Sequence, residues 1–346
     1  MKVSVLGAGA IGSMFGGLLR QHNPELELVL VARGEHGAAM RNSGKVGLIG
    51  PWGRYDVPVM VTDKPAEIRR SDLVLFTVKS QATEEAIRAA APFIDDAIVV
   101  SIQNGINHRI LAQFIRHDSL VMGMTATNMA VLEPGSVSLQ LNGATILGSV
   151  PGRDATKAVG TAATLLRSTG LPVDPHPNVL GVQYNKLAIN VLGYASCLSA
   201  SNFITEAILD KPWRRSVALP LLRECIAAYD AAGIELARIP GVPDVYGFRR
   251  FLRLLEVPLL GAALRAGARA KFNRKPIVFS LYQDLLRKKA TEIDFINGEI
   301  VRLLNERGGD APYNALVVQM VHELEARGDG TFFSRDEVIQ RFEALK

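Results

Sequence analysis

Three glycines near the start of the chain, Gly7, Gly9 and Gly12, have the spacing of a dinucleotide-binding turn. They follow an apolar strand signal that begins at Val3, and a helix pattern continues from them to Arg20. In this order Gly7 allows the tight turn, Gly9 lets the backbone approach a pyrophosphate, and Gly12 lets the helix pack closely on the strand. Unpaired N–H groups at the helix N-terminus favour an anion. The stretch therefore predicts a nucleotide site.

The second predicted strand, Leu26 to Val31, ends where a dinucleotide-binding protein places its ribose-binding residue. The chain reads Ala32-Arg33-Gly34 at this point, without the acid that would bind the 2′-hydroxyl of NAD. A guanidinium suits a 2′-phosphate through paired, charge-assisted hydrogen bonds. We therefore expect NADP(H) as the cofactor. The alternative is that Arg33 is a solvated loop arginine.

Two further polar groups follow apolar runs that are typical of buried parallel strands. The run from Asp72 to Val78 ends at Lys79, and the run from Ala97 to Ile102 ends in Gln103-Asn104-Gly105. Because ligands of open α/β sheets bind at the carboxyl ends of the strands, Lys79 and Asn104 are candidate cofactor or substrate contacts. Alternatively, Asn104 belongs to a simple turn and Lys79 is solvated.

A third set of polar residues, Lys186, Asn190 and Tyr194, occurs at four-residue intervals in a helix predicted from Val179 to Ala200. This spacing puts the three side chains on one face of the helix. Their neighbours are apolar, so the lysine and the asparagine need polar partners. A binding pocket would supply them; otherwise Lys186 reaches solvent at a helix end.

The predicted elements change type along the chain. Strand and helix signals alternate up to the proline-rich segment Leu171 to Asn178, and almost all of the remaining pattern is helical. We predict an α/β fold with a doubly wound, Rossmann-type sheet in residues 1–175 and an all-helical domain in residues 176–346. Ser280 and Glu292 form a second polar set on a helical stretch predicted from Ile277 to Glu306. Other predicted elements are strands at Val57–Val61, with Pro58 marking an edge, Leu120–Met124, Ser136–Leu141 and Thr145–Leu147, a helix at Ala155–Ser168, and a last helix with the capping box Ser334–Glu337.

Length and composition fit a globular protein of two domains. The chain has 346 residues, of which 48% are apolar and 21% charged, with a formal net charge of +5. Its two cysteines, Cys197 and Cys225, are too few for a disulfide scaffold and have no metal-ligand spacing, so we expect a cytoplasmic protein without a metal. No apolar run approaches the length of a membrane span. The sequence leaves the oligomeric state open, with a homodimer among the options.

The segment from residue 234 to 275 is a candidate basic insertion. Between Arg249 and Lys275 it carries eight basic residues and one acid, Glu256. Such a run could attract an anionic partner, but it is more often a solvated helix face or a flexible insertion. No nucleic-acid-binding motif accompanies it, so we expect no nucleic-acid partner.

Several motifs together resemble the ketopantoate reductases (2-dehydropantoate 2-reductases), a family of the 6-phosphogluconate-dehydrogenase-like oxidoreductases. The resemblance spans most of the chain, and the lysine-asparagine helix and the T-E-I-D-x-I-N-G stretch are its specific parts. The motifs are GAGAIG at Gly7–Gly12, Arg33, Thr77–Lys79, Gln103–Gly105, Asn185–Asn190, Ser280 with Gln283–Asp284, and Thr291–Gly298.

The resemblance implies NADPH-dependent reduction of a 2-keto acid to a 2-hydroxy acid, namely ketopantoate to pantoate in pantothenate and coenzyme A synthesis. It implies that Lys186 is the general acid, that Glu292 orients the substrate, and that the active site lies in a cleft between an N-terminal dinucleotide domain and a helical domain. An ammonium group suits this chemistry because hydride transfer to a ketone builds negative charge on oxygen. Substrate contacts would be Asn104, Asn190, Tyr194 and Ser280; cofactor contacts would be Gly7, Gly9, Ala10, Ile11, Gly12, Arg33, Lys79 and Asn104.

Two departures from the family pattern leave the substrate open. Tyr194 stands where the family usually carries a second asparagine, and the basic segment before Ser280 is longer than in compact members. Reduction of another 2-keto acid, or an opine-type reaction that joins a keto acid to an amine, would keep the other motifs. A non-catalytic NADP(H)-sensing protein is a further alternative, but it would have no use for Lys186 and Glu292 together.

Overall fold

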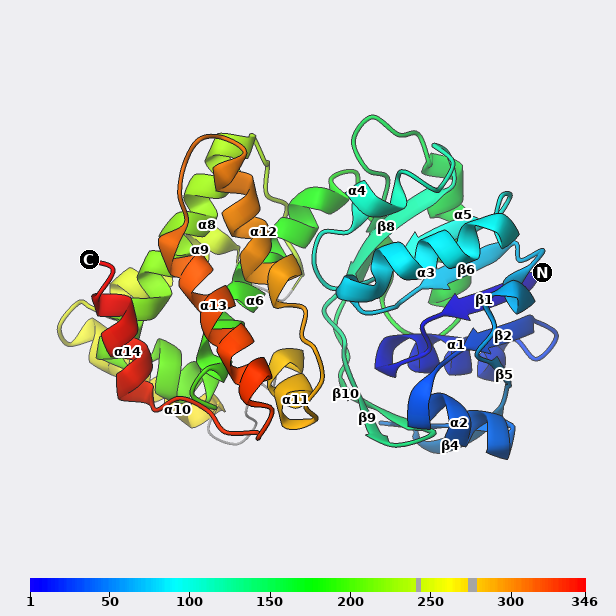
Figure 1. The fold of residues 1–346 in the computed structure, drawn as a ribbon, viewed down its shortest axis with the longest axis horizontal. Coiled ribbons are helices and arrows are strands. Elements are labelled where there is room, and N and C mark those ends of the chain that lie inside the picture. The colour runs from blue at the N-terminus through cyan, green and yellow to red at the C-terminus, as the bar shows by residue number, and fades with distance from the viewer. Residues whose placement is uncertain (241–243, 273–278) are drawn as a thin grey trace. The chain divides into compact units, whose positions relative to one another are not determined.

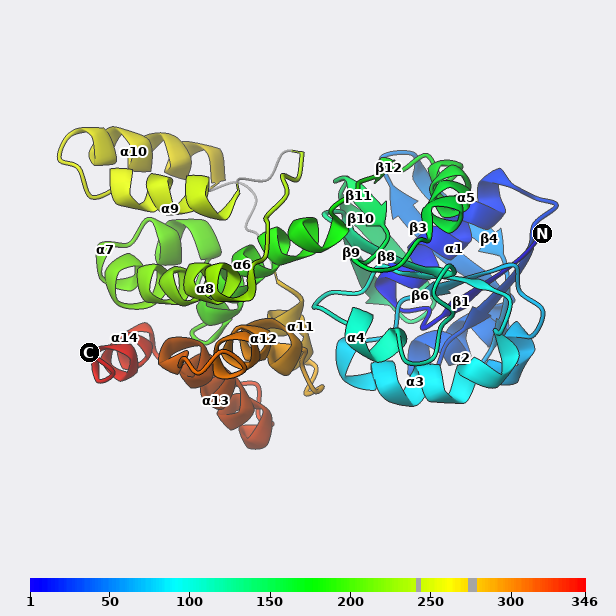
Figure 2. The same cartoon turned by 90° about the horizontal axis from the view of Figure 1, so that it is seen from above.

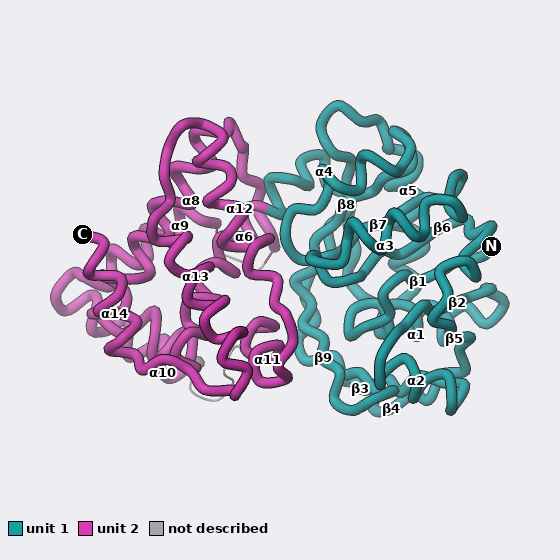
Figure 3. The backbone as a smooth tube through the Cα atoms, viewed as in Figure 1, with its two compact units in different colours: residues 1–183 teal, residues 184–346 magenta. Residues whose placement is uncertain are grey.

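The structure is a computed structural model that describes residues 1–240, 244–272 and 279–346. It divides into two compact units, residues 1–183 and 184–346, and the division falls inside helix α6 (Val179–Cys197) (Figure 3). Unit 1 combines sheets and helices, whereas the described part of unit 2 is helical, which confirms the predicted fold class. Within the described residues no helix is both long enough and apolar enough to cross a bilayer.

Unit 1 is built on an eight-stranded sheet with the strand order β12-β11-β8-β7-β6-β1-β2-β5 (Figure 1). All neighbouring strands run parallel except β8 and β11, which pair antiparallel. From β1 the chain extends the sheet in two directions, through β2 and β5 on one side and through β6, β7 and β8 on the other, as in a doubly wound sheet. The strands are β1 (Lys2–Leu6), β2 (Glu27–Val31), β5 (Met60–Thr62), β6 (Leu73–Phe76), β7 (Ile98–Ser101), β8 (Leu120–Thr125), β11 (Thr145–Gly148) and β12 (Val173–Pro175).

Alternate residues of the central strands face two separate hydrophobic cores. Val3 and Val5 belong to one core, together with side chains of α1 and α5. Val74 and Phe76 belong to the other, together with side chains of α3 and α4. Figure 2 shows the sheet between these two layers of helices. The helices of unit 1 are α1 (Ala10–His22), α2 (Gly34–Ser43), α3 (Thr83–Ala90), α4 (His108–Leu111) and α5 (Thr156–Arg167), with 3₁₀ turns η1 (Pro65–Ile68), η2 (Ser80–Ala82) and η3 (Ala91–Phe93).

A second, four-stranded sheet covers α1 in unit 1. Its order is β4-β3-β10-β9, built from two hairpins far apart in sequence. A Cβ atom on Gly17 of α1 would lie 2.8 Å from the side chain of Leu48 of β3, so the helix packs on this sheet more closely than a larger residue at this position would allow. The sequence did not predict this sheet as a separate layer. Its strands are β3 (Lys45–Gly50), β4 (Gly53–Pro58), β9 (Asn128–Glu133) and β10 (Ser136–Leu141).

The strand predicted from Val57 to Val61 is wrong as a single element. The chain ends β4 at Pro58, which lies on an edge as expected, and after Val59 it begins β5 in the other sheet. Pro58 has no N–H for a ladder on its far side, so the strand stops there. The other predicted strands and the helix near 155–168 are confirmed to within two residues at each end.

The elements described in unit 2 are helices, and η4 and η5 among them are short π-helical segments. Within it α12 and α13 lie side by side, and α8 packs against both (Figures 1 and 2). Ser334 accepts a hydrogen bond from the N–H of Glu337 (3.1 Å), as the predicted cap of α14 requires. The elements after α6 are η4 (Phe203–Ile208), α7 (Lys211–Trp213), η5 (Arg214–Ala218), α8 (Leu219–Ala232), α9 (Val245–Leu254), α10 (Leu260–Phe272), α11 (Ser280–Leu286), α12 (Ile293–Asn305), α13 (Pro312–Arg327) and α14 (Arg335–Glu343).

The single helix predicted from Ile277 to Glu306 is wrong. Its start, Ile277, lies outside the described residues, and the rest divides into α11 and α12. Lys288 takes a left-handed conformation (φ 54°), and the N–H of Lys289 donates to the carbonyl of Asp284 (2.9 Å), which closes α11. Such a 6→1 bond is typical of a helix C-terminus. Glu292 is therefore the N-cap residue of α12 instead of a mid-helix residue.

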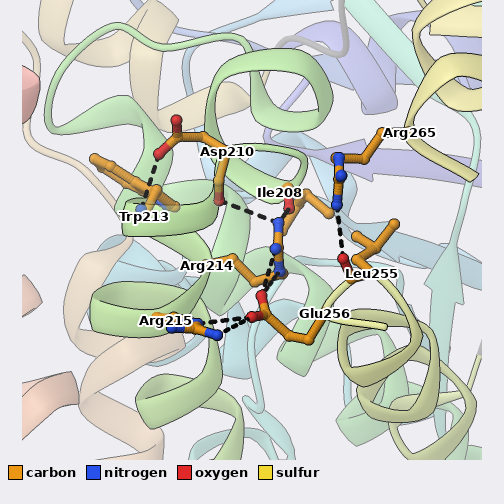
Figure 4. Close-up of polar contacts among 8 residues, drawn as sticks. All are labelled: Ile208, Asp210, Trp213, Arg214, Arg215, Leu255, Glu256 and Arg265. Carbon is orange, nitrogen blue, oxygen red and sulfur yellow. Dashed lines mark hydrogen bonds and ion pairs between the residues drawn. The ribbon is translucent and has the colours of Figure 1, made fainter. Parts of the chain in front are cut away.

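The described residues of the basic run, from Arg249 onward, lie in α9, in α10 and in the turn between them, and the one acid of this run, Glu256, is held by arginines of η5. Arg214, which is fully buried, donates to Glu256 Oε1 through Nε (2.8 Å) and a second nitrogen, and Arg215 donates to Oε2 (2.6 Å). Arg214 also donates to the carbonyls of Ile208 (3.1 Å) and Asp210 (3.2 Å) at the end of η4 (Figure 4). The turn between α9 and α10 is thus fastened to the unit's interior. Of the predicted basic run, Arg274 and Lys275 lie outside the described residues.

Candidate active site

The glycine turn of unit 1 has the geometry that its sequence predicts. Gly7 has a φ of 94°, and a Cβ atom there would lie 2.6 Å from the backbone nitrogen of Val78. A Cβ on Gly12 would lie 2.5 Å from Thr77 Oγ1. Both positions therefore exclude any other residue without a backbone shift. Thr77 in turn donates to the carbonyl of Gly7 (2.9 Å), which ties the turn to the end of β6.

Gly9 differs from the other two glycines because it is exposed and has open space beside it. An added Cβ would meet only the carbonyl oxygen of Gly7, at 4.0 Å. Gly9 is also the N-cap of α1 and provides no side-chain cap, so the first turn of the helix, Ala10 to Gly12, presents its N–H groups without a competing side-chain oxygen from the cap. A phosphate can approach this backbone closely. The turn therefore fits the pyrophosphate of a nicotinamide dinucleotide.

Polar side chains at the carboxyl ends of β6 and β7 are joined in one network. Gln103 donates to the carbonyl of Val78 (2.9 Å) across the two strand ends. Ser80 Oγ (2.6 Å) and Asn107 Nδ2 (2.8 Å) both donate to the carbonyl of Asn104. The backbone of Asn104 is thereby fixed at the sheet edge, with its side chain partly exposed. The structure thus brings Asn104 next to the segment that carries Lys79.

Two residues that build this network, Ser80 and Asn107, were not predicted from the sequence. Ser80 and Asn107 are almost fully buried, and Asn107 also donates to Ser80 (3.0 Å). The available signal was their place just after two apolar strands, where buried polar groups must find partners. Their role is to hold the loops that present Lys79 and Asn104.

Arg33 and Lys79 are both exposed. Arg33 is the N-cap residue of α2, directly after β2, and its guanidinium lies 3.3 Å from the carboxylate of Glu85 on α3. Both partners are mostly in solvent, so this ion pair is weak and a stronger anion can replace it. Lys79 precedes the 3₁₀ turn η2. Arg33 thus follows the second strand, where doubly wound sheets that bind dinucleotides carry their ribose-binding residue.

In unit 2, Lys186 of α6 and Glu292 lie close enough for their charges to interact. Lys186 is partly buried, and Glu292 is almost completely buried at the start of α12. Burial lowers the pKa of Lys186 to about 8, and the Glu292 carboxylate opposes this shift. An ammonium group with a pKa near neutrality can both stabilise a developing oxyanion and give it a proton.

Tyr194 and Ser280 lie in the same region of unit 2 and share a hydrogen bond of 2.9 Å. The charge of Glu292 also acts on Tyr194, whose pKa is raised well above its usual value, mainly by burial. Asn190, one helical turn before Tyr194, is partly exposed. The structure therefore brings Lys186 and Tyr194 of α6 together with Ser280 and Glu292, which come from more than eighty residues further along the chain.

The chain matches two family models with the description "Ketopantoate reductase PanE/ApbA", the first over residues 3–152 and the second, for the C-terminal part, over residues 178–325. It is 30% identical over 331 residues to the 2-dehydropantoate 2-reductase of Pyrococcus abyssi, covering 94% of this chain and 98% of the relative. It is 29% identical over 337 residues to the corresponding protein of Pyrococcus horikoshii, covering 96% and 100%.

Solved structures share the whole fold. A PanE/ApbA family ketopantoate reductase from Ralstonia eutropha superposes with a TM-score of 0.75 at 26% identity, over 95% of this chain and 99% of that one. D-mandelate dehydrogenase in a ternary structure with NADH and anilino(oxo)acetate also gives a TM-score of 0.75, over 95% and 100%, and at 22% identity this likeness is one of fold. Together with the family models and the curated relatives, these findings show that the chain belongs to the ketopantoate reductase family of oxidoreductases.

Proposed function

We propose that this protein reduces ketopantoate to pantoate with NADPH and that Lys186 is the proton donor. The observation that carries the proposal is the electrostatic interaction of Lys186 with Glu292: a lysine whose pKa burial brings to about 8 lies within reach of the charge of a buried glutamate. Family membership supplies the reaction class, and the named relatives are 2-dehydropantoate 2-reductases.

In the proposed reaction the hydride and the proton come from different donors. When bound, the reduced nicotinamide supplies a hydride to the ketone carbon. Lys186 stabilises the negative charge that builds on the ketone oxygen and then gives that oxygen its proton, which yields the 2-hydroxy acid. Glu292 raises the proton affinity of Lys186 and so keeps a larger share of it protonated near neutral pH. Asn190 and Ser280 contribute amide and hydroxyl groups for the polar atoms of the substrate.

The glycine turn and the carboxyl edge of the sheet in unit 1 would hold the cofactor. The proposed contacts are the N–H groups from Gly9 to Gly12, with Lys79 and Asn104 at the ends of β6 and β7. Preference for NADPH is supported by Arg33 and by the absence of an acid between Glu27 and Glu35, where an NAD-specific protein carries one.

The direct test is steady-state oxidation of NADPH by the purified protein with ketopantoate, beside a panel of other 2-keto acids with and without amino acids, each repeated with NADH. The highest kcat/KM for ketopantoate with NADPH would support the proposal. Turnover of another keto acid alone would leave the Lys186 chemistry in place and overturn the substrate. This second candidate is favoured by Tyr194, which stands where the family usually has an asparagine.

Replacing Arg33 by alanine is expected to raise KM for NADPH roughly 10- to 100-fold and to leave KM for NADH nearly unchanged, because charge-assisted bonds to the 2′-phosphate are lost. Arg88→Ala is the matched control, since Arg88 is an equally exposed arginine on α3, paired with Glu84 at 2.7 Å. An equal loss for both cofactors would show that Arg33 does not bind the 2′-phosphate.

The pH dependence of the reaction follows from the pKa of Lys186. A general acid must be protonated, so kcat for keto acid reduction should be constant below about pH 8 and fall as the pH rises through that value. A profile measured from pH 6 to 10 at saturating cofactor tests this. A plateau that extends to pH 10 would contradict a proton donor with the pKa of Lys186.

A further inference from the structure

Ser280 is fixed against α6 by an aromatic contact as well as by its bond to Tyr194. The ring of Phe279, the residue just before Ser280, meets Tyr194 edge to face (centroids 6.3 Å apart, 84°) and Phe203 of η4 in the same manner (5.1 Å, 79°). Phe279 is therefore held between α6 and η4. Because it is the neighbour of Ser280 in the chain, its position sets where the serine begins α11.

The contact between Phe279 and α6 depends on a glycine. A Cβ atom on Gly193 would lie 2.1 Å from Cζ of Phe279, a distance that no real pair of carbons reaches without bonding. Gly193 thus lets the ring of Phe279 rest directly on the helix backbone. Gly193, Tyr194, Phe279 and Ser280 together form what we call the α6 clasp. The sequence did not single out Gly193 or Phe279, because nothing local shows which distant ring will lie on a helical glycine.

The partners available to the two hydroxyls of the clasp determine which one donates in the hydrogen bond between Tyr194 and Ser280. Tyr194 is 1% exposed, and within the described residues Ser280 Oγ is its only hydrogen-bond partner. Burial raises the pKa of Tyr194 well above its usual value, so the phenol keeps its proton. A buried O–H that donates no hydrogen bond carries the full free-energy penalty of its removal from water. Tyr194 therefore donates, and Ser280 accepts.

The hydroxyl hydrogen of Ser280 is then left to point elsewhere. Ser280 is partly exposed, and among the described residues it bonds to none but Tyr194. A hydroxyl that accepts one bond becomes a better donor of another, because bonds in a chain polarise one another. The accessible side of the clasp therefore presents an O–H donor.

We infer that Tyr194 is a positioning residue that acts through Ser280: by donating to Ser280 it makes this hydroxyl a donor to an acceptor oxygen of the keto acid. The inference rests on the proposed function, in which Ser280 contacts the substrate. It assigns Tyr194 an indirect role, since a side chain that is 1% exposed contacts no ligand itself. Substrate binding therefore depends on the tyrosine hydroxyl only while Ser280 is present.

A double-mutant cycle tests this dependence, with Tyr194→Phe, Ser280→Ala and the double variant. We expect Ser280→Ala to raise KM for the keto acid roughly 10-fold and Tyr194→Phe to raise it roughly 3- to 10-fold. The double variant should be no worse than Ser280→Ala alone, and KM for NADPH should stay within about twofold in all three variants, because neither side chain is a proposed cofactor contact. Tyr246→Phe is the control, because Tyr246 is an exposed tyrosine whose hydroxyl donates to Asp230 (3.2 Å).

For the same set of variants, the Kd for ketopantoate is measured by calorimetric titration into protein saturated with NADP⁺. This measurement reports binding without turnover. A wild type that binds the keto acid but does not reduce it would overturn the proposed function and leave the inference to be decided by the binding cycle. Additive effects of the two substitutions, or a Tyr194→Phe variant with normal binding, would overturn the inference. No loss of binding in Ser280→Ala would overturn both the role of Ser280 and the inference.

Gly193→Ala provides an independent variant, because it moves Phe279 without removing either hydroxyl. We expect it to raise KM and the calorimetric Kd for the keto acid at least as much as Tyr194→Phe. Its far-ultraviolet circular dichroism should match that of the wild type, which shows that the helices remain. Normal keto acid binding in this folded variant would overturn the clasp as the element that positions Ser280.

Discussion

Replacing Lys186 by alanine is expected to lower kcat by roughly 10²-fold or more, the usual contribution of a well-placed general acid. The variant loses both the charge that stabilises the developing oxyanion and the proton that quenches it. Binding of the cofactor should be nearly intact, because the glycine turn and Arg33 belong to unit 1 and Lys186 to unit 2. Stopped-flow measurement of NADPH oxidation at saturating keto acid gives the chemical step directly.

Two companion variants make the Lys186 result specific. Lys186→Arg keeps a positive charge but has a pKa too high to give up a proton near neutral pH, so it should remain slow. Lys157→Ala removes an exposed lysine of α5 and should behave like the wild type. An unchanged kcat in Lys186→Ala, or full activity in Lys186→Arg, would contradict the assignment of Lys186 as the proton donor.

The parts of the site that the sequence predicts are those in which spacing along one element decides the geometry. Gly7 and Gly12 were predictable because a strand, a turn and a helix in this order leave no room for a Cβ, and the structure shows contacts of 2.5–2.6 Å there. The helical period likewise put Lys186 and Tyr194 on one face. In each case the information is local.

The parts that sequence analysis missed depend on segments far apart in the chain. Glu292 was expected within one long helix because residues 287–292 contain no glycine or proline to mark a break, but the left-handed Lys288 ends α11 first. The contact of Phe279 with Gly193 and the bond from Asn107 to Ser80 join distant segments, and no periodicity encodes them. The second sheet was missed for the same reason, since β3 and β10 pair across almost ninety residues.

Glu256 is the clearest example of such a long-range contact. In the sequence it is the single acid of a basic run, and such a run was interpreted as more often a solvated helix face or a flexible insertion. In the structure its two carboxylate oxygens are taken by Arg214 and Arg215. These two guanidinium groups lower the pKa of Glu256 although partial burial opposes ionisation. The carboxylate is therefore ionised at neutral pH, and its stabilising effect is lost only as the pH falls through that lowered value.

Replacing Glu256 by glutamine is expected to destabilise unit 2 by about 3 kcal/mol, because it leaves the charge of Arg214 buried without a counter-charge. Arg214 is fully buried, and its remaining partners are the carbonyls of Ile208 and Asp210, which solvate a guanidinium but do not neutralise it. The loss should appear as a lower urea midpoint. Trp213 is the reporter, since it is buried next to Arg214 and is the only tryptophan left in a Trp52→Phe background.

Two comparisons separate a buried charge from an ordinary surface pair. Glu337→Gln removes one partner of Arg341 on α14 (2.9 Å) while Glu323 remains paired with this arginine, and a surface pair with i,i+4 spacing is worth at most about 0.5 kcal/mol. In the double variant Arg214→Met with Glu256→Gln, the buried charge is gone together with its partner, so the destabilisation should be smaller than the sum of the two single effects. If the two effects simply add, Arg214 depends on its carbonyl bonds alone, and Glu256 serves only to fasten the turn between α9 and α10.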